Sequence, residues 1–200
     1  GQVELLPRSP HEWLPDGDFA YFLLDAVKVL DLSAIEMALQ AKDPRGVRPY
    51  HPRMMVGLLL YAYCTGVRSS RKIEAATHRD LGFRFVTGGQ HPDHDTICAF
   101  RRQFAEPLQD LFVQSAQLAQ RLGMVKLGAV SLDGTKIASD ASKHKAMSYG
   151  RMVAEEARLR KEIERMLSEA EAVDKEEDAR LGTGRRDDQL PEELRRREGR

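Results

Sequence analysis

The sequence predicts a mainly α-helical protein that carries a single β-hairpin near its middle. Apolar residues recur at helical spacing over most of the 200 residues, and only one short stretch predicts a pair of strands. Hydrophobic residues make up 42% of the chain and charged residues 31%, which is typical of soluble globular proteins. This length allows one sizeable core or two small ones.

The first 125 residues are expected to form a helical domain. Residues 1–15 hold three prolines and predict an irregular lead-in, whereas residues 18–40 follow helical periodicity with one break. Residues 53–64 are apolar nearly all round, which is the pattern of a central buried helix. Further amphipathic helices are predicted over residues 71–79, from residue 93 or 95 to 104, and over residues 108–122.

Residues 126–148 predict the only clear β element. An Asp-Gly pair, Asp133 and Gly134, lies between short apolar runs, and this dipeptide favours the tight turn of a hairpin. Strands are expected over residues 128–133 and 135–140. From its local sequence, Asp133 is explained by turn chemistry, because Asp tolerates tight backbone geometry and Gly supplies a positive φ.

Residues 149–200 predict a charged helical segment. Apolar residues recur there in a heptad-like stripe that consists of Met152, Leu159, Ile163, Met166, Ala170 and Val173. From residue 151 to 200 the chain holds 13 basic and 15 acidic residues, so the segment has little net charge. One helix cannot bury such a stripe alone, so the tail is expected either to fold back or to pair with another chain.

Charge is unevenly distributed, although the formal net charge of the whole chain is zero. Residues 45–104 hold ten basic and four acidic residues, and ten minus four gives a net charge of +6. The predicted helices from 68 to 104 have the general form of a module that lays one helix in the major groove. The side chains expected nearest to DNA are Arg71, Lys72, Arg101 and Arg102, on outer helix faces. The alternative is that they only solvate a helical bundle.

The cysteine and histidine pattern excludes two classes of site. Cys64 and Cys98 lie in apolar surroundings and predict packed thiols without a disulfide. Together with His78, His91 and His94, they lack the close ligand spacing of a structural zinc site. No apolar run is long enough to span a bilayer, and the first residues show no signal-peptide pattern, so a cytoplasmic protein without membrane contact is predicted.

Three blocks in the same order resemble one protein family. They are LLLYAYCTGVRSSRKIE at residues 58–74, PDHDTICAFRRQF at residues 92–104 and SLDGTKIASDASKHKAMSYGRM at residues 131–152. Together they resemble bacterial insertion-sequence DDE transposases, from about residue 3 to the end of the chain. The resemblance implies a helical N-terminal DNA-binding domain over residues 1–125, the first β-hairpin of an RNase H-like α/β catalytic domain over 126–148, and a charged, coiled-coil-like helical insertion over 149–200.

The resemblance also implies a catalytic role for Asp133. It is expected to be the first of three carboxylates that hold two Mg²⁺ or Mn²⁺ ions for DNA cleavage and strand transfer. The second Asp and the final Glu are not recognised in this sequence, so the catalytic domain is expected to be incomplete. We therefore expect no strand-transfer activity and no stably bound metal ion in this chain alone. The expected partner is double-stranded DNA at the terminal inverted repeats of the element.

Two other interpretations remain open on sequence grounds. One is a non-catalytic, helix-turn-helix-like DNA-binding regulator that forms a homo-oligomer through residues 152–173. The other is a structural helical protein in which Asp133 is only a turn residue.

Overall fold

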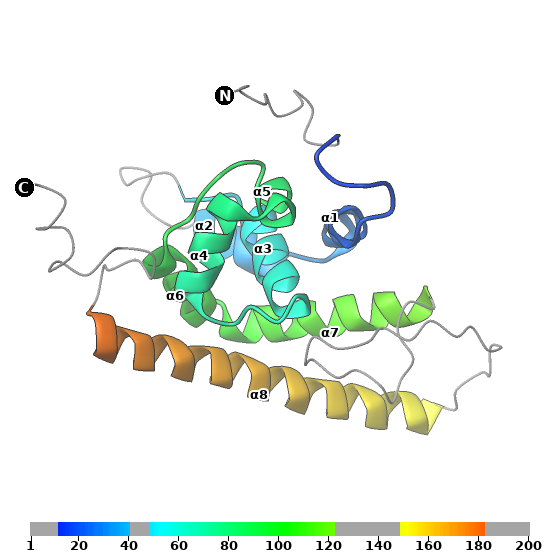
Figure 1. Cartoon of the computed structure of the whole chain (residues 1–200). Helices are drawn as coiled ribbons and strands as arrows, with labels where there is room; N and C mark the ends of the chain where they lie inside the picture. The colour runs from blue at the N-terminus through cyan, green and yellow to red at the C-terminus, as the bar shows by residue number, and fades with distance from the viewer. Residues whose placement is uncertain (1–11, 41–48, 123–148, 183–200) are drawn as a thin grey trace, which may run out of the picture.

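Helices make up all the regular structure in the described part of the chain. The computed structural model describes residues 12–40, 49–122 and 149–182 (Figure 1), and they form α1 (Phe19–Val29), α2 (Ser33–Gln40), α3 (Pro52–Cys64), α4 (Ser70–Arg79), α5 (Leu81–Val86), α6 (His94–Gln103), α7 (Ala105–Arg121) and α8 (Tyr149–Leu181). The mainly α prediction is confirmed. The predicted β-hairpin, and with it the opening of an RNase H-like sheet, lies outside the described residues. None of the described helices combines the length and the apolar content needed to cross a membrane.

Polar side chains explain where several helices begin. Asp18, Ser69, Asp80 and Asp93 each accept a hydrogen bond from a backbone N–H in the first turn of the following helix. Pro52 opens α3, where its fixed φ and missing N–H suit the first helical position.

The central helix of the fold is α3, as its apolar sequence predicts. Residues 55–63 are buried without a break, and α3 contacts both α1 and α5. On α5, Gly82 lies so close to Tyr61 that an added Cβ would be 2.0 Å from the tyrosine hydroxyl oxygen. The ring of Tyr61 packs edge-on against Phe83, with their centroids 5.0 Å apart. This close approach fixes α5 against α3.

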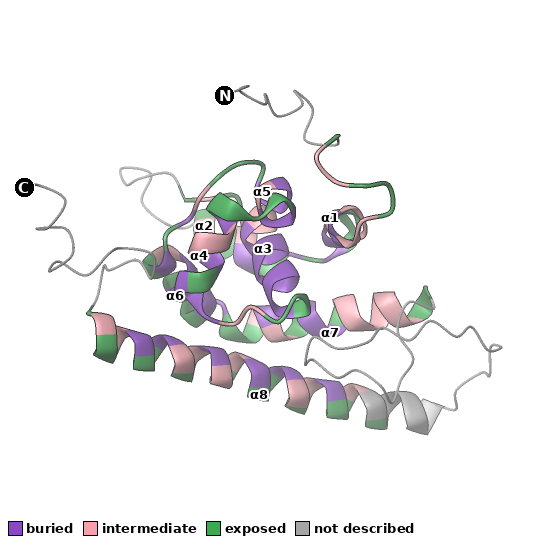
Figure 2. Ribbon diagram, in the orientation of Figure 1, coloured by how far each residue is buried: buried purple, intermediate pink, exposed green. Residues whose placement is uncertain are grey.

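The long helix α8 lies along α7 and adds its inner side to the same core (Figures 1 and 2). Leu159, Ile163, Met166 and Ala170 of the predicted stripe are all buried. Burial is confirmed for these four residues, which pack on the chain's own helices, whereas Val173 is half-buried. The structure therefore does not support a regulator that dimerises through residues 152–173, because Leu159, Ile163, Met166 and Ala170 are already covered within the chain.

Candidate functional site

Basic and hydroxyl side chains around α4 and α6 meet the carboxylates of α8 along one interface. We define the basic face as Arg68, Ser69, Ser70, Arg71, Arg101 and Arg102. We define the acidic face of α8 as Glu169, Glu171, Asp174, Glu177 and Asp178. Each carboxylate of the acidic face hydrogen-bonds or forms an ion pair with a residue of the basic face. Most of these contacts join residues about a hundred positions apart.

Asp174 is the most enclosed carboxylate of the acidic face, at 3% exposed. Its Oδ1 accepts the backbone N–H of Ser70 at 2.8 Å, and its Oδ2 accepts the Ser70 hydroxyl at 2.6 Å. The thiol of Cys98 also donates to Oδ2 at 2.8 Å, and the guanidinium of Arg101 pairs with the same oxygen. Both carboxylate oxygens are thus satisfied by donors, at the N-terminal end of α4 where the helix dipole favours an anion.

These surroundings keep Asp174 ionised. Burial raises the pKa of its carboxyl. Hydrogen bonds from Cys98 and Ser70 and the charge of Arg101 lower the pKa by a larger amount, so it lies below the ordinary 3.8. Burial raises the pKa of the Cys98 thiol to about 11, and the bond to Asp174 adds to this effect. The thiol is therefore protonated at neutral pH and acts as a donor, not as a nucleophile.

Arg71 joins α4 to both α6 and α8. Its guanidinium donates to Asp178 at 2.5 Å and to the backbone carbonyl of Gly182 at 3.0 Å. Its Nη1 lies 2.9 Å from Nε2 of His94. Because a guanidinium can only donate, Nε2 accepts and the imidazole proton lies on Nδ1, which donates to Glu74 at 2.7 Å. One continuous chain of hydrogen bonds thus connects the three helices.

The outer ion pairs of the interface are more exposed. Arg68 pairs with Glu169 at 2.5 Å, and these side chains are 32% and 42% exposed. Arg102 lies 3.9 Å from Glu171, with exposures of 48% and 40%. Exposed pairs of this kind contribute about 0–1 kcal/mol and weaken in salt. The interface therefore has an enclosed centre at Asp174 and a solvated rim.

The structure divides the residues predicted to contact DNA into two pairs. Arg71 and Arg101 are 2% and 3% exposed, so their predicted position on outer helix faces is wrong. The reason is tertiary, because the carboxylates of α8 cover both guanidiniums. Lys72 and Arg102 are exposed as predicted. Contact with DNA stays a prediction for all four.

The predicted metal site is not covered by the structure, because Asp133 lies outside the described residues. Among the residues that the structure describes, no group of three or more His, Cys, Asp or Glu side chains is arranged to hold a metal ion. The role of Asp133 as a Mg²⁺ or Mn²⁺ ligand therefore stays a prediction.

The acidic face was not predicted from the sequence. Its signal was the spacing of Asp174, Glu177 and Asp178, which recur three and four residues apart and so lie on one side of a helix. Ala170 of the apolar stripe precedes Asp174 by four residues, which places it on the same side. The spacing thus places the stripe and the carboxylates on one continuous inward side of the helix.

The outward side of α4 is cationic. Lys72, His78 and Arg79 are exposed, whereas Glu74, the one acidic residue of this helix, is buried against His94. The helix therefore presents basic groups to solvent without an exposed carboxylate of its own. A basic stripe along a helix is the electrostatic pattern of nucleic-acid-binding helices.

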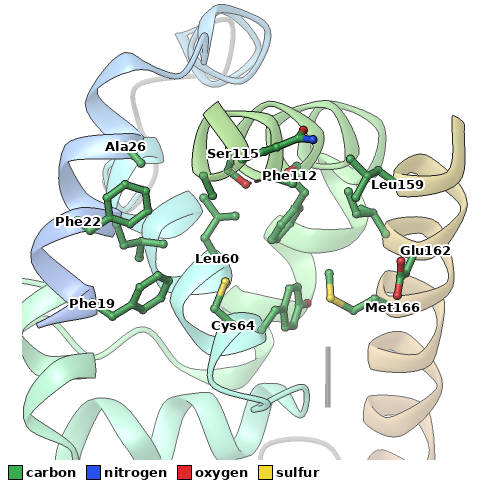
Figure 3. Close-up of a pocket in the computed structure, with 16 residues that line it drawn as sticks. Phe19, Phe22, Ala26, Leu60, Cys64, Phe112, Ser115, Leu159, Glu162 and Met166 are labelled. Carbon is green, nitrogen blue, oxygen red and sulfur yellow. Dashed lines mark hydrogen bonds between the residues drawn. The ribbon is translucent and has the colours of Figure 1, made fainter. Parts of the chain in front are cut away.

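An apolar cavity of about 180 Å³ lies between α1, α3, α7 and α8. Figure 3 shows Phe22, Leu60, Phe112, Leu159 and Met166 among the side chains that line it. An active-site pocket combines an apolar lining with several convergent polar groups. Here the lining is almost entirely apolar, so the ionic interface is the stronger functional candidate.

The fold and the interface define a helical module in which two cationic helices are covered by a long acidic one. Residues 8–103 match the family model described as Transposase domain (DUF772). The matched segment ends with α6, so it contains the basic face, whereas α7 and α8 lie beyond it. No curated protein and no solved structure matches the chain.

Proposed function

We propose that this chain is the DNA-binding N-terminal part of a DDE transposase and that it holds double-stranded DNA at the terminal inverted repeats of its element. The family match over residues 8–103 supports a role in transposition. The observation that carries the DNA-binding part is the outward side of α4, where Lys72, His78 and Arg79 are exposed and no carboxylate of that helix is.

Exposed basic side chains on one helix contribute to DNA binding in two ways. A phosphate contact by Lys72 or Arg79 releases condensed counterions, so the logarithm of the affinity falls with the logarithm of salt by about 0.9 per phosphate neutralised. A helix in the major groove also brings such side chains to the base edges, where arginine recognises guanine with two hydrogen bonds. Arg102, which is exposed on α6, is assigned a supporting phosphate contact.

The catalytic part of the proposal rests on the resemblance to DDE transposases. In the complete enzyme, Asp133 with a further Asp and a Glu would hold two Mg²⁺ or Mn²⁺ ions, which supply Lewis-acid chemistry for strand cleavage and transfer when bound. A single carboxylate does not fix two metal ions. DNA binding is therefore the activity that we propose for the chain itself.

The test is equilibrium binding of the purified chain to a duplex that carries a terminal inverted repeat and to an unrelated duplex, over a range of salt. The proposal expects preference for the repeat and a steep loss of affinity as salt rises. Replacing Lys72 and Arg79 by Ala should weaken binding and reduce the salt slope by roughly one for each lost phosphate contact.

A matched control removes the same charge elsewhere. Arg121 on α7 and Lys161 on α8 are both exposed, and replacing both by Ala should leave binding nearly unchanged. Equal losses in the two double variants would show that net charge, and not α4, accounts for binding. No binding to either duplex at low salt would overturn the proposal.

A further inference from the structure

Two kinds of contact hold α8 along its length. In its first part, Leu159, Ile163 and Met166 are buried in the hydrophobic core and act as an apolar anchor. From residue 169 onward, Ala170 is the one fully buried apolar side chain among the described residues, and hydrogen bonds and ion pairs join this part of α8 to the basic face. A stretch held by charge is open to competition from another polyanion, whereas an apolar anchor is not.

The groups around Asp174 have the chemistry of a phosphate site. The backbone N–H and the hydroxyl of Ser70 converge on its carboxylate together with the guanidinium of Arg101. Backbone N–H groups at a helix start, hydroxyls and guanidiniums are the groups with which proteins bind DNA phosphates. Asp174 therefore occupies a position whose donors can also bind the oxygens of a phosphodiester.

Neighbouring groups extend this site along α4. The hydroxyl of Ser69 donates to Glu177 at 2.6 Å, and Arg71 donates to Asp178. A second observation is a buried donor without an acceptor: Nε of Arg101 has no hydrogen-bond partner among the described atoms. The carboxylates of α8 thus leave one cationic donor of the basic face unsatisfied, which a ligand with more acceptor oxygens could use.

We propose that the basic face is a binding site for the phosphate backbone of duplex DNA, and that the acidic face of α8 occupies it as an intramolecular competitor. DNA and the second half of α8 then exclude each other, while the apolar anchor keeps the first half of α8 in place. The proposal rests on the DNA-binding function proposed above. It gives Arg71 and Arg101 a DNA contact only after α8 has withdrawn.

The two faces come from different parts of the chain, which agrees with this competition. The basic face lies within residues 8–103, the segment that matches the transposase-domain family. The acidic face lies outside it, on a helix that the chain adds after that domain. The competitor is thus contributed by a different part of the chain from the site that it covers.

The first experiment measures hydrogen exchange of the intact chain with and without the terminal-repeat duplex. Displacement predicts that DNA accelerates exchange of the amides from residue 171 to 181 by about tenfold or more, while amides from 159 to 167 stay protected. Unchanged or slower exchange from 171 to 181 under conditions where the duplex is bound would overturn the competition and leave DNA binding intact.

The second experiment compares affinities for the same duplex. A double variant with Asp174→Asn and Glu177→Gln should bind about tenfold more tightly than the unchanged chain. The control, Glu106→Gln with Glu164→Gln, removes the same charge at exposed positions of α7 and α8 and should bind almost as the unchanged chain does.

The outcomes separate the two proposals. Equal gains in both double variants would show a general charge effect and would overturn the competition. Failure of the unchanged chain and of both variants to bind at low salt would overturn DNA binding itself. If the Asp174 variant does not fold, the exchange experiment on the unchanged chain still decides.

Discussion

Asp174 and Arg101 lie 73 residues apart in the sequence and form an ion pair in which each side chain is 3% exposed. Arg101 is one of the residues that the sequence marks for DNA contact, and Asp174 covers it from a helix outside the family domain. An enclosed ion pair is costly to break on one side only, because the remaining charge loses its partner. The pair therefore couples the position of α8 to the availability of the basic face.

Asp174→Asn is expected to lower the free energy of unfolding by roughly 1–3 kcal/mol, because Ser70 and Arg101 lose a charged acceptor while the side-chain volume is unchanged. The larger loss of about 3–5 kcal/mol that follows an unpaired buried charge is not expected, because opening of the second half of α8 returns Arg101 to water. Urea unfolding at neutral pH measures the change, with Glu164→Gln as an exposed control. A loss in the larger range would mean that this half of α8 stays docked on the basic face, which would contradict its displacement by DNA.

Asp174 also predicts how stability depends on acid. Its pKa in the folded chain lies below the ordinary 3.8, so folding favours the ionised carboxylate. This contribution is fully present above pH 3.8 and is lost as the pH falls toward the lower folded value. The stability difference between the unchanged chain and Asp174→Asn should therefore be constant from neutral pH to about pH 5 and shrink in stronger acid. Urea unfolding at successive pH values measures it, and a difference that grows on acidification would contradict the lowered pKa.

Gly82→Ala is expected to destabilise the fold by about 1–3 kcal/mol, because the new methyl group overlaps the buried Tyr61 side chain. An added Cβ would lie 2.0 Å from the hydroxyl oxygen and 2.8 Å from Cζ of that ring. Gly57→Ala on α3 is the matched control, since a Cβ there finds its nearest neighbour, Val86, at 3.6 Å. Thermal unfolding should separate the two variants, and equal midpoints would show that Tyr61 shifts without cost.

Ile163→Ala is expected to cost about 2–5 kcal/mol, because it removes an apolar side chain from a site that is 6% exposed. Lys161→Ala, two residues away and exposed, should change stability little. Since the stripe is covered within the chain, the thermal midpoint should not depend on protein concentration. A midpoint that rises with concentration would indicate that the stripe pairs with a second copy.

Local periodicity predicted most of the helical framework. The apolar run of residues 53–64 became the central helix α3, and the stripe at Leu159, Ile163 and Met166 became the buried side of α8. These predictions hold because the periodicity that marks the apolar face of a helix, and the caps at Ser69 and Asp93, depend only on residues within a turn or two of the chain. The helix that covers the stripe could not be predicted from the sequence, because an apolar face can be buried by a helix of the same chain or of another chain.

Arg71 and Lys72 show what only the tertiary structure decided. They are adjacent in sequence, and the sequence by itself determined that both are basic residues in the first turns of one amphipathic helix. Successive residues of an α-helix point about 100° apart, so α8, docked on one side of α4, buries the arginine at 2% exposed and leaves the lysine in solvent. The sequence determined the helices and their charges. Which charges stay open to a partner depended on contacts between segments about a hundred residues apart, which no local pattern encodes.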